Sequence, residues 1–155
     1  MTVATVRGRV AVVVSRYNEA VTARLLEGAR RCLKDKGVPD ARVDVIWVPG
    51  AFELPVAAEA AAATGRYAAI VALGCVIRGE TPHFEYVAGE AARGLGNVAL
   101  AHRLPVGFGV LTTETLAQAR ARAGGEAGDK GYEAAEAALA TADVLARLSG
   151  AAPRD

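Results

Sequence analysis

The chain has 155 residues, a length that suits one domain with its own hydrophobic core, and we expect no domain boundary within residues 1–155. Its formal net charge of +1 gives no electrostatic reason to expect binding to nucleic acid or to an anionic membrane. Because no apolar run is long enough to span a bilayer and no secretory leader is recognisable, we expect a cytoplasmic protein.

The first half of the chain alternates strand-like and helix-like segments. Arg9 to Val14 is almost entirely valine and alanine, which predicts a buried strand. Apolar residues from Val21 to Leu33 then follow helical spacing, and Gly37 suits the end of that helix. Val43 to Val48 predicts a second strand, and residues 54–64 predict a second helix.

The second half continues the alternation. Ala69 to Gly74 predicts a third strand, and a helix is expected from about Phe84 to near Ala99. Val106 to Leu111 predicts a fourth strand. Thr115, with Gln118 three residues later, has the pattern of a capping box and predicts a short helix that ends at Gly124. A long final helix is expected over residues 131–148.

This order of elements predicts the fold class. Strands that alternate with helices form right-handed crossovers and a parallel sheet covered on both faces. We therefore expect an α/β protein, a three-layer sandwich with a central, mainly parallel four-stranded sheet flanked by helices. Residues 2–6 could add a fifth strand, either in the same sheet or on the edge of a neighbouring copy.

Composition adds two further expectations. Cys32 and Cys75 form no C-x-x-C pair and fall in apolar segments, so they are expected to be reduced core thiols rather than a disulfide. Alanine is abundant and aromatic residues make up only 5% of the chain. Small apolar side chains on many helix faces indicate more buried surface than one monomer needs, which favours a homo-oligomer.

The turn after the third strand is the strongest candidate for a functional site. Gly79 to Pro82 joins an apolar strand to a helix, and such turns bind small anions through backbone N–H groups and the helix dipole. Thr81 adds a hydroxyl, and His83 adds an imidazole in the first helical turn. An anion site beside a proton-transfer group indicates chemistry on a phosphorylated or otherwise anionic small molecule.

Loops that follow the other strands should lie beside this turn, because the carboxyl ends of parallel strands meet at one edge of the sheet. They contribute Tyr17 after the first strand and Phe52 with Glu53 after the second. An aromatic ring, a carboxylate and an anion site together suit a planar, hydrogen-bonding heterocycle next to an anion.

Each of these residues also has a structural interpretation, and taken singly none decides the function. Tyr17 could be an exposed turn residue, Phe52 a core residue and Glu53 a helix cap. His83 could be an ordinary first-turn residue. The remaining candidates default to structural or solvated roles: His102, Arg120, Arg122 and Lys130.

Five segments together resemble the 6,7-dimethyl-8-ribityllumazine synthase family. They occur in the order and at the spacing of that family and cover nearly the whole chain after its first eight residues. The segments are Arg16-Tyr17-Asn18, residues 48–55 (VPGAFELP), residues 74–87 (GCVIRGETPHFEYV), residues 108–113 (FGVLTT) and residues 128–131 (GDKG).

The resemblance implies a transferase that performs the penultimate step of riboflavin biosynthesis. That enzyme condenses 5-amino-6-(D-ribitylamino)uracil with 3,4-dihydroxy-2-butanone 4-phosphate and releases phosphate and water. The reaction has no redox step, so the resemblance implies no metal and no organic cofactor. Imine formation, phosphate elimination and ring closure all move protons, which suits an imidazole.

The resemblance also implies the role of each site residue. His83 matches the proton-transfer histidine, and Tyr17 stands where the family stacks an aromatic ring, more often Phe or Trp. Glu80 and Thr81 match the phosphate site, where the Glu80 side chain is expected to point away while its N–H donates. Arg122 matches the arginine that pairs with the phosphate. The residues matched to the pyrimidine and ribityl site are Ala51, Phe52, Glu53, Cys75, Val76 and Ile77, with Phe108 and Lys130 supplied by the adjacent subunit.

The family fold is flavodoxin-like, and its smallest functional unit is a pentamer with active sites at subunit interfaces. Some members pair two pentamers, and others assemble twelve into a 60-subunit icosahedral capsid. The short link over residues 123–130 resembles that of the capsid-forming members. Riboflavin synthase is a candidate partner.

Two alternatives to the enzyme are considered. One is a non-catalytic homologue that binds a lumazine or flavin, or forms a shell, although the joint presence of His83, Arg122 and Lys130 argues against it. The other is a flavodoxin-type flavin carrier, which would need a phosphate loop after the first strand. Residues 15–19 (SRYNE) have no glycine or hydroxyl cluster of that kind.

Overall fold

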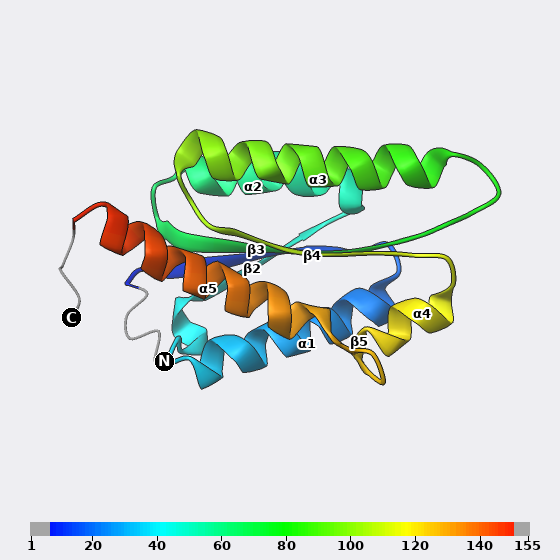
Figure 1. Cartoon of the computed structure of the whole chain (residues 1–155), viewed down its shortest axis with the longest axis horizontal. Coiled ribbons are helices and arrows are strands. Elements are labelled where there is room, and N and C mark those ends of the chain that lie inside the picture. The colour runs from blue at the N-terminus through cyan, green and yellow to red at the C-terminus, as the bar shows by residue number, and fades with distance from the viewer. Residues whose placement is uncertain (1–6, 151–155) are drawn as a thin grey trace.

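A sheet of four parallel strands forms the centre of the molecule in a computed structural model that describes residues 7–150 (Figure 1). Its strand order is β2-β1-β3-β4, and every pairing is parallel. The strands are β1 (Arg9–Ser15), β2 (Val43–Val48), β3 (Tyr67–Ile77) and β4 (Val106–Thr113). The predicted parallel four-stranded sheet is confirmed, whereas the possible strand over residues 2–6 lies outside the described residues.

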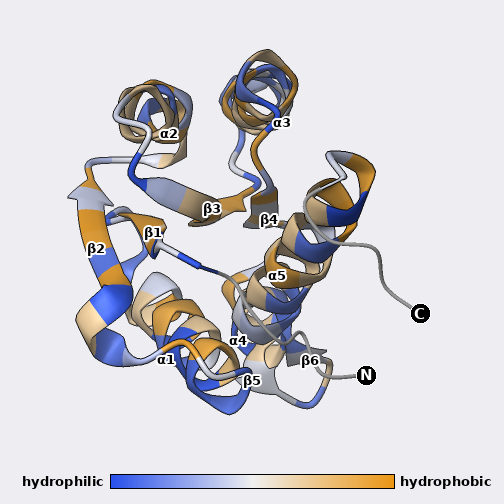
Figure 2. Ribbon diagram, turned by 90° about the vertical axis from the view of Figure 1, so that its left-hand side faces the viewer, coloured by the Kyte–Doolittle hydropathy of each residue, from blue (hydrophilic) through white to orange (hydrophobic). Residues whose placement is uncertain are grey.

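Helices cover both faces of this sheet and complete three layers (Figure 2). On one face lie α2 (Leu54–Ala63) and α3 (His83–His102), and on the other lie α1 (Glu19–Asp35), α4 (Leu116–Ala121) and α5 (Lys130–Leu148). The shorter elements are two 3-10 helices, η1 (Asp40–Arg42) and η2 (Ala51–Glu53), and a small hairpin of β5 (Ala123–Gly125) and β6 (Gly128–Asp129). Within residues 7–150, no helix combines the length and apolarity that crossing a membrane requires.

The core consists of two apolar clusters, one on each side of the sheet. Alternate β1 residues point to opposite sides: Val10, Val12 and Val14 pack toward α1 and α5, whereas Ala11 and Val13 pack toward α2 and α3. All five are fully buried. Since burying one valine side chain contributes roughly 1.5–3 kcal/mol, this strand must be apolar on both faces, as its sequence indicated.

The structure differs from the sequence prediction mainly at element ends. β3 continues through Gly74 to Ile77 instead of stopping at the glycine. A Cβ on Gly74 would lie only 3.1 Å from Leu54 Cδ1, so the glycine allows η2 and the start of α2 to approach the sheet. The short helix α4 ends at Ala121 rather than Gly124, because the chain then turns into the β5–β6 hairpin.

Candidate active site

The loops after β1, β2 and β3 are joined by hydrogen bonds at the carboxyl edge of the sheet. The Arg16 and Tyr17 N–H groups donate to the Val48 and Pro49 carbonyls at 2.8 and 3.0 Å. Asn18 Nδ2 donates to the Cys75 carbonyl at 3.0 Å. Asn18 also has a φ of 63°, a left-handed conformation that asparagine tolerates better than most residues. These bonds fix the turn that carries Tyr17 against the two neighbouring strand ends.

A cavity of about 620 Å³ opens between these loops and the first turns of α3. That volume lies within the range of small-molecule sites. The predicted residues that line it are Tyr17, Ala51, Phe52, Glu53, Cys75, Val76 and His83, and it is also lined by Pro49, Gly50, Tyr86 and Val87. The structure therefore brings the predicted aromatic, carboxylate and imidazole groups to one place.

The cavity is lined by three exposed aromatic side chains, Tyr17, Phe52 and Tyr86, and by one buried thiol. Tyr17 and Phe52 are 73% and 55% exposed, so both rings are available to stack on a planar ligand. Cys75 is buried, and burial raises the pKa of its thiol to about 11. Near neutral pH this thiol is mostly protonated, which makes it a poor nucleophile and suits an apolar wall of the cavity.

The turn that the sequence predicts to bind an anion leads directly into α3. Glu80 and Thr81 are exposed in the turn, and His83 is the first residue of this 20-residue helix. No side chain caps the helix start, and the Glu85 N–H donates to the Pro82 carbonyl at 3.0 Å, which leaves the N–H groups of His83 and Phe84 for an anion. Neither Glu80 nor Thr81 lines the 620 Å³ cavity, and Ile77 packs against the core cluster on the α1 side instead.

Phe108, Arg122 and Lys130 lie in a second cavity of about 370 Å³ along β4, the edge strand of the sheet. The Lys130 N–H donates to the Arg122 carbonyl at 2.8 Å, which places these two cationic residues side by side. Arg122 Nη1 donates to the Gln118 carbonyl at 3.0 Å. The first cavity, which contains His83, is called the histidine cavity below. It shares no lining residue with this second cavity.

Sequence reasoning did not assign some residues that build the site. Tyr86 and Val87 line the histidine cavity because they lie three and four residues after His83, on the same face of α3. That spacing could have identified them. Asn18, although named in a motif, was not predicted to hold Cys75. Among residues 7–150, no group of three or more His, Cys, Asp or Glu side chains is arranged to hold a metal ion.

These features define a three-layer α/β protein with an open cavity at the carboxyl ends of parallel strands, where such folds bind ligands. The family model for 6,7-dimethyl-8-ribityllumazine synthase matches residues 7–146. The chain is also 56% identical over 144 residues to 6,7-dimethyl-8-ribityllumazine synthase of Edwardsiella ictaluri, and the match covers 92% of each chain.

The chain belongs to the 6,7-dimethyl-8-ribityllumazine synthase family. This confirms the family predicted from the five sequence segments. The family and the name of this relative support the penultimate step of riboflavin biosynthesis, a transferase reaction.

Proposed function

We propose that the protein condenses 5-amino-6-(D-ribitylamino)uracil with 3,4-dihydroxy-2-butanone 4-phosphate to 6,7-dimethyl-8-ribityllumazine, with release of phosphate and water. The observation that carries the proposal is the composition of the histidine cavity. One open site of suitable size contains Tyr17 and Phe52 for stacking, Glu53 as a carboxylate and His83 as a proton carrier. Family membership supports the same reaction.

The pyrimidine substrate is assigned to the inner part of this cavity. The Tyr17 ring stacks on the uracil, and the lining residues Ala51 to Glu53, Cys75 and Val76 hold its polar edge and ribityl chain. The N–H groups of Glu80 and Thr81 and the Thr81 hydroxyl, in the turn before α3, bind the phosphate of the second substrate. This arrangement orients the 5-amino group toward the ketone, and such positioning supplies much of the rate in a bimolecular condensation.

His83 is assigned the proton transfers. Imine formation between the amine and the ketone releases water, phosphate then leaves as the adjacent carbon loses a proton, and ring closure releases a second water. Each step needs a proton moved at the reacting centre, and an imidazole can both accept and donate one near neutral pH. The exposed position of His83 at the start of α3 leaves its ring accessible to the bound substrates.

A complete site requires two copies of the chain in this proposal. Arg122, Phe108 and Lys130 of one copy complete the histidine cavity of the next, since within one chain they line a separate cavity. Large exposed apolar side chains supply surface for such contacts: Phe52, Val56, Tyr86 and Leu100 are between 55% and 81% exposed. The assembly is proposed to be a pentamer or a 60-subunit capsid of twelve pentamers, in the cytoplasm, with riboflavin synthase as a candidate partner.

The direct test is to mix the purified protein with both substrates and follow the absorbance and fluorescence of the lumazine product against a blank without protein. Product formation well above the blank is expected. Formation at the blank rate, with substrate or riboflavin still bound, would instead identify the non-catalytic binding or shell-forming homologue.

A further inference from the structure

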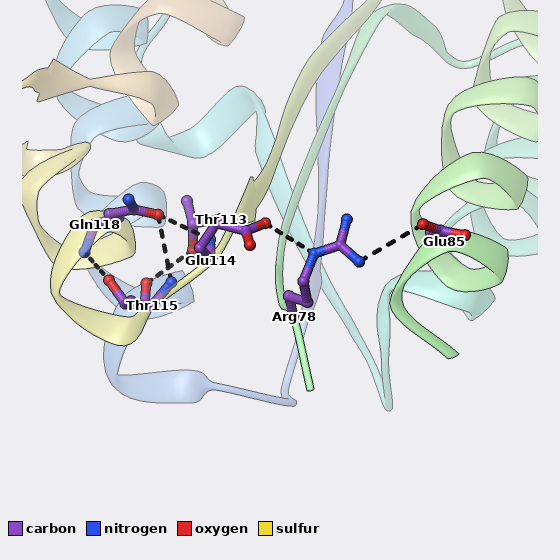
Figure 3. Close-up of polar contacts among 6 residues, drawn as sticks. All are labelled: Arg78, Glu85, Thr113, Glu114, Thr115 and Gln118. Atoms are coloured by element: carbon purple, nitrogen blue, oxygen red, sulfur yellow. Dashed lines mark hydrogen bonds and ion pairs between the residues drawn. The ribbon is translucent and has the colours of Figure 1, made fainter. Parts of the chain in front are cut away.

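The Arg78 side chain connects three separate elements next to the site (Figure 3). It follows the last residue of β3, and its Nε donates to Glu114 Oε2 at 2.8 Å. Its Nη1 lies 3.5 Å from Glu85 Oε1 in the first turn of α3. The guanidinium carbon also lies 4.6 Å from the centre of the Phe84 ring, which is close enough for a cation–π contact. Both contacts on α3 involve the two residues that follow His83.

The start of α3 has few other attachments to the body of the protein. The buried residues of this helix are Ala91, Leu95 and Val98, so burial begins two turns after His83. Phe84 and Val87 are only partly buried against the core. Since no side chain caps the helix start, the position of the His83 turn depends on these partial contacts and on Arg78.

Glu114, the partner of Arg78 on the other side, lies in a hydrogen-bonded turn between β4 and α4. The Glu114 and Thr115 N–H groups donate to Gln118 Oε1 at 2.8 and 3.3 Å, and the Gln118 N–H donates to Thr115 Oγ1 at 3.1 Å. This is the predicted capping box. The Arg78 N–H also donates to the Thr113 carbonyl at 2.9 Å, which continues the β3–β4 pairing. Arg78 therefore joins the exposed helix start to the hydrogen-bonded turn that follows the edge strand.

We propose that Arg78 is a positioning residue, which holds the first turn of α3, and with it His83, against the β4–α4 turn for catalysis. The inference rests on the proposed function, because it needs His83 to act in the reaction. The two ion pairs of Arg78 are not expected to contribute much to the global free energy of unfolding. Arg78, Glu85 and Glu114 are 39%, 64% and 62% exposed, and ion pairs that accessible contribute little to stability.

The test compares Arg78→Met with a matched control. The methionine keeps an unbranched apolar stem over Phe84 but removes both ion pairs. Arg93→Met removes another exposed arginine–glutamate pair on the same helix, with Glu90, away from the turn. Arg78→Lys retains one positive charge but lacks the fork that reaches two carboxylates, so a partial effect is expected.

For Arg78→Met, we expect kcat to fall about tenfold, since a displacement of only 1 Å in a reacting group can cost ~100-fold. The KM for the pyrimidine should stay within about twofold, because Tyr17 and residues 51–53 are held by other contacts. Glu114→Gln should lower kcat in the same direction, and the double variant should be no worse than Arg78→Met alone. Arg93→Met should match the wild type.

A second readout does not depend on turnover. Hydrogen exchange measured by mass spectrometry should become faster in residues 79–90 of Arg78→Met, and should be unchanged in residues 130–148 and throughout Arg93→Met. Unchanged exchange in residues 79–90 would overturn the proposal, as would faster exchange without a fall in kcat. If the wild type itself forms no lumazine, the proposed function fails, and the exchange data still report whether Arg78 holds the turn.

Discussion

At the scale of single residues, His83 and Arg122 are expected to affect different kinetic constants. Replacing His83 with alanine removes the proposed proton carrier and leaves the stacking and backbone contacts, so kcat should fall by ~10²-fold or less with KM nearly unchanged. Arg122→Ala should instead raise the KM for the phosphate substrate, because a guanidinium pairs with phosphate through two parallel hydrogen bonds. Steady-state kinetics with each substrate varied separately would reveal the split, and the reverse pattern would refute both assignments.

The buried thiols give a second prediction at this scale. Burial raises the pKa of both Cys32 and Cys75 from 9.0 to about 11. A shift of about two units lowers the thiolate fraction at pH 8 by about 100-fold, and only the thiolate reacts with a disulfide reagent.

Reaction with a disulfide reagent at pH 8 should therefore be at least about 100-fold slower in the folded protein than in denaturant. Its rate should still be rising steeply with pH at pH 10. A rate that is half-maximal near pH 9 would show that these thiols are in contact with water.

At the scale of elements, the contact between α1 and α5 depends on a glycine. A methyl group on Gly131 would overlap the Leu25 carbonyl, and neither backbone can withdraw without separating the two helices. Gly131→Ala should therefore destabilise the protein by about 1–3 kcal/mol, as expected for overpacking of a tight contact.

Gly96→Ala provides the matched control for this substitution. Gly96 lies in the interior of α3, and a Cβ there meets no atom within 4 Å, so alanine should be neutral or stabilise by up to about 1 kcal/mol. Denaturant unfolding of both variants gives the comparison. Equal effects of the two substitutions would contradict the packing argument.

The sequence predicted elements well where long apolar patterns exist and poorly where the element is short. The strand Val43–Val48 was predicted at its observed bounds. The β5–β6 hairpin was missed, since strands of three and two residues carry no periodicity. Gly74 suggested a strand end, although its function is to admit Leu54. The contact between Arg78 and Glu114 was also unpredictable, because no local pattern fixes the partner of a long charged side chain.

The candidate site was predictable in part, because it follows from the predicted parallel topology. Parallel topology alone placed Tyr17, Glu53 and His83 at one edge, and the structure brings them into one cavity. By contrast, Arg122 and Lys130 were assigned to that site only because of the family resemblance. Their separate cavity within one chain agrees with a role across an interface but leaves that role a prediction.

At the scale of the whole molecule, a shared site predicts complementation between two defective variants. When His83→Ala and Arg122→Ala chains are co-expressed, some interfaces combine an intact histidine from one chain with an intact arginine from the next. Random mixing in a ring makes about a quarter of the sites complete, so activity at low substrate should recover to about a quarter of the wild-type value. Activity equal to the average of the two separate variants would place the whole site within one chain.

The mass of the assembly is a separate prediction at this scale. Light scattering or sedimentation should give a multiple of five chains, and the prediction of a 60-subunit capsid rests on the resemblance of residues 123–130 to the link in capsid-forming members of the family. A mass near five chains would exclude the capsid and leave the proposed reaction intact. A monomer that retains full activity would contradict the shared site.

The order of the elements along the chain also determines when each side of the core can form during synthesis. The cluster under α2 and α3 is built mostly from residues before position 103, so it can form while the rest of the chain is still on the ribosome. The other cluster needs Ala135 and Leu139 of α5, near the end of the chain. Until that helix emerges, one face of the central strand β1 remains incompletely covered, and a nascent chain stalled before residue 130 should be the species that chaperones bind.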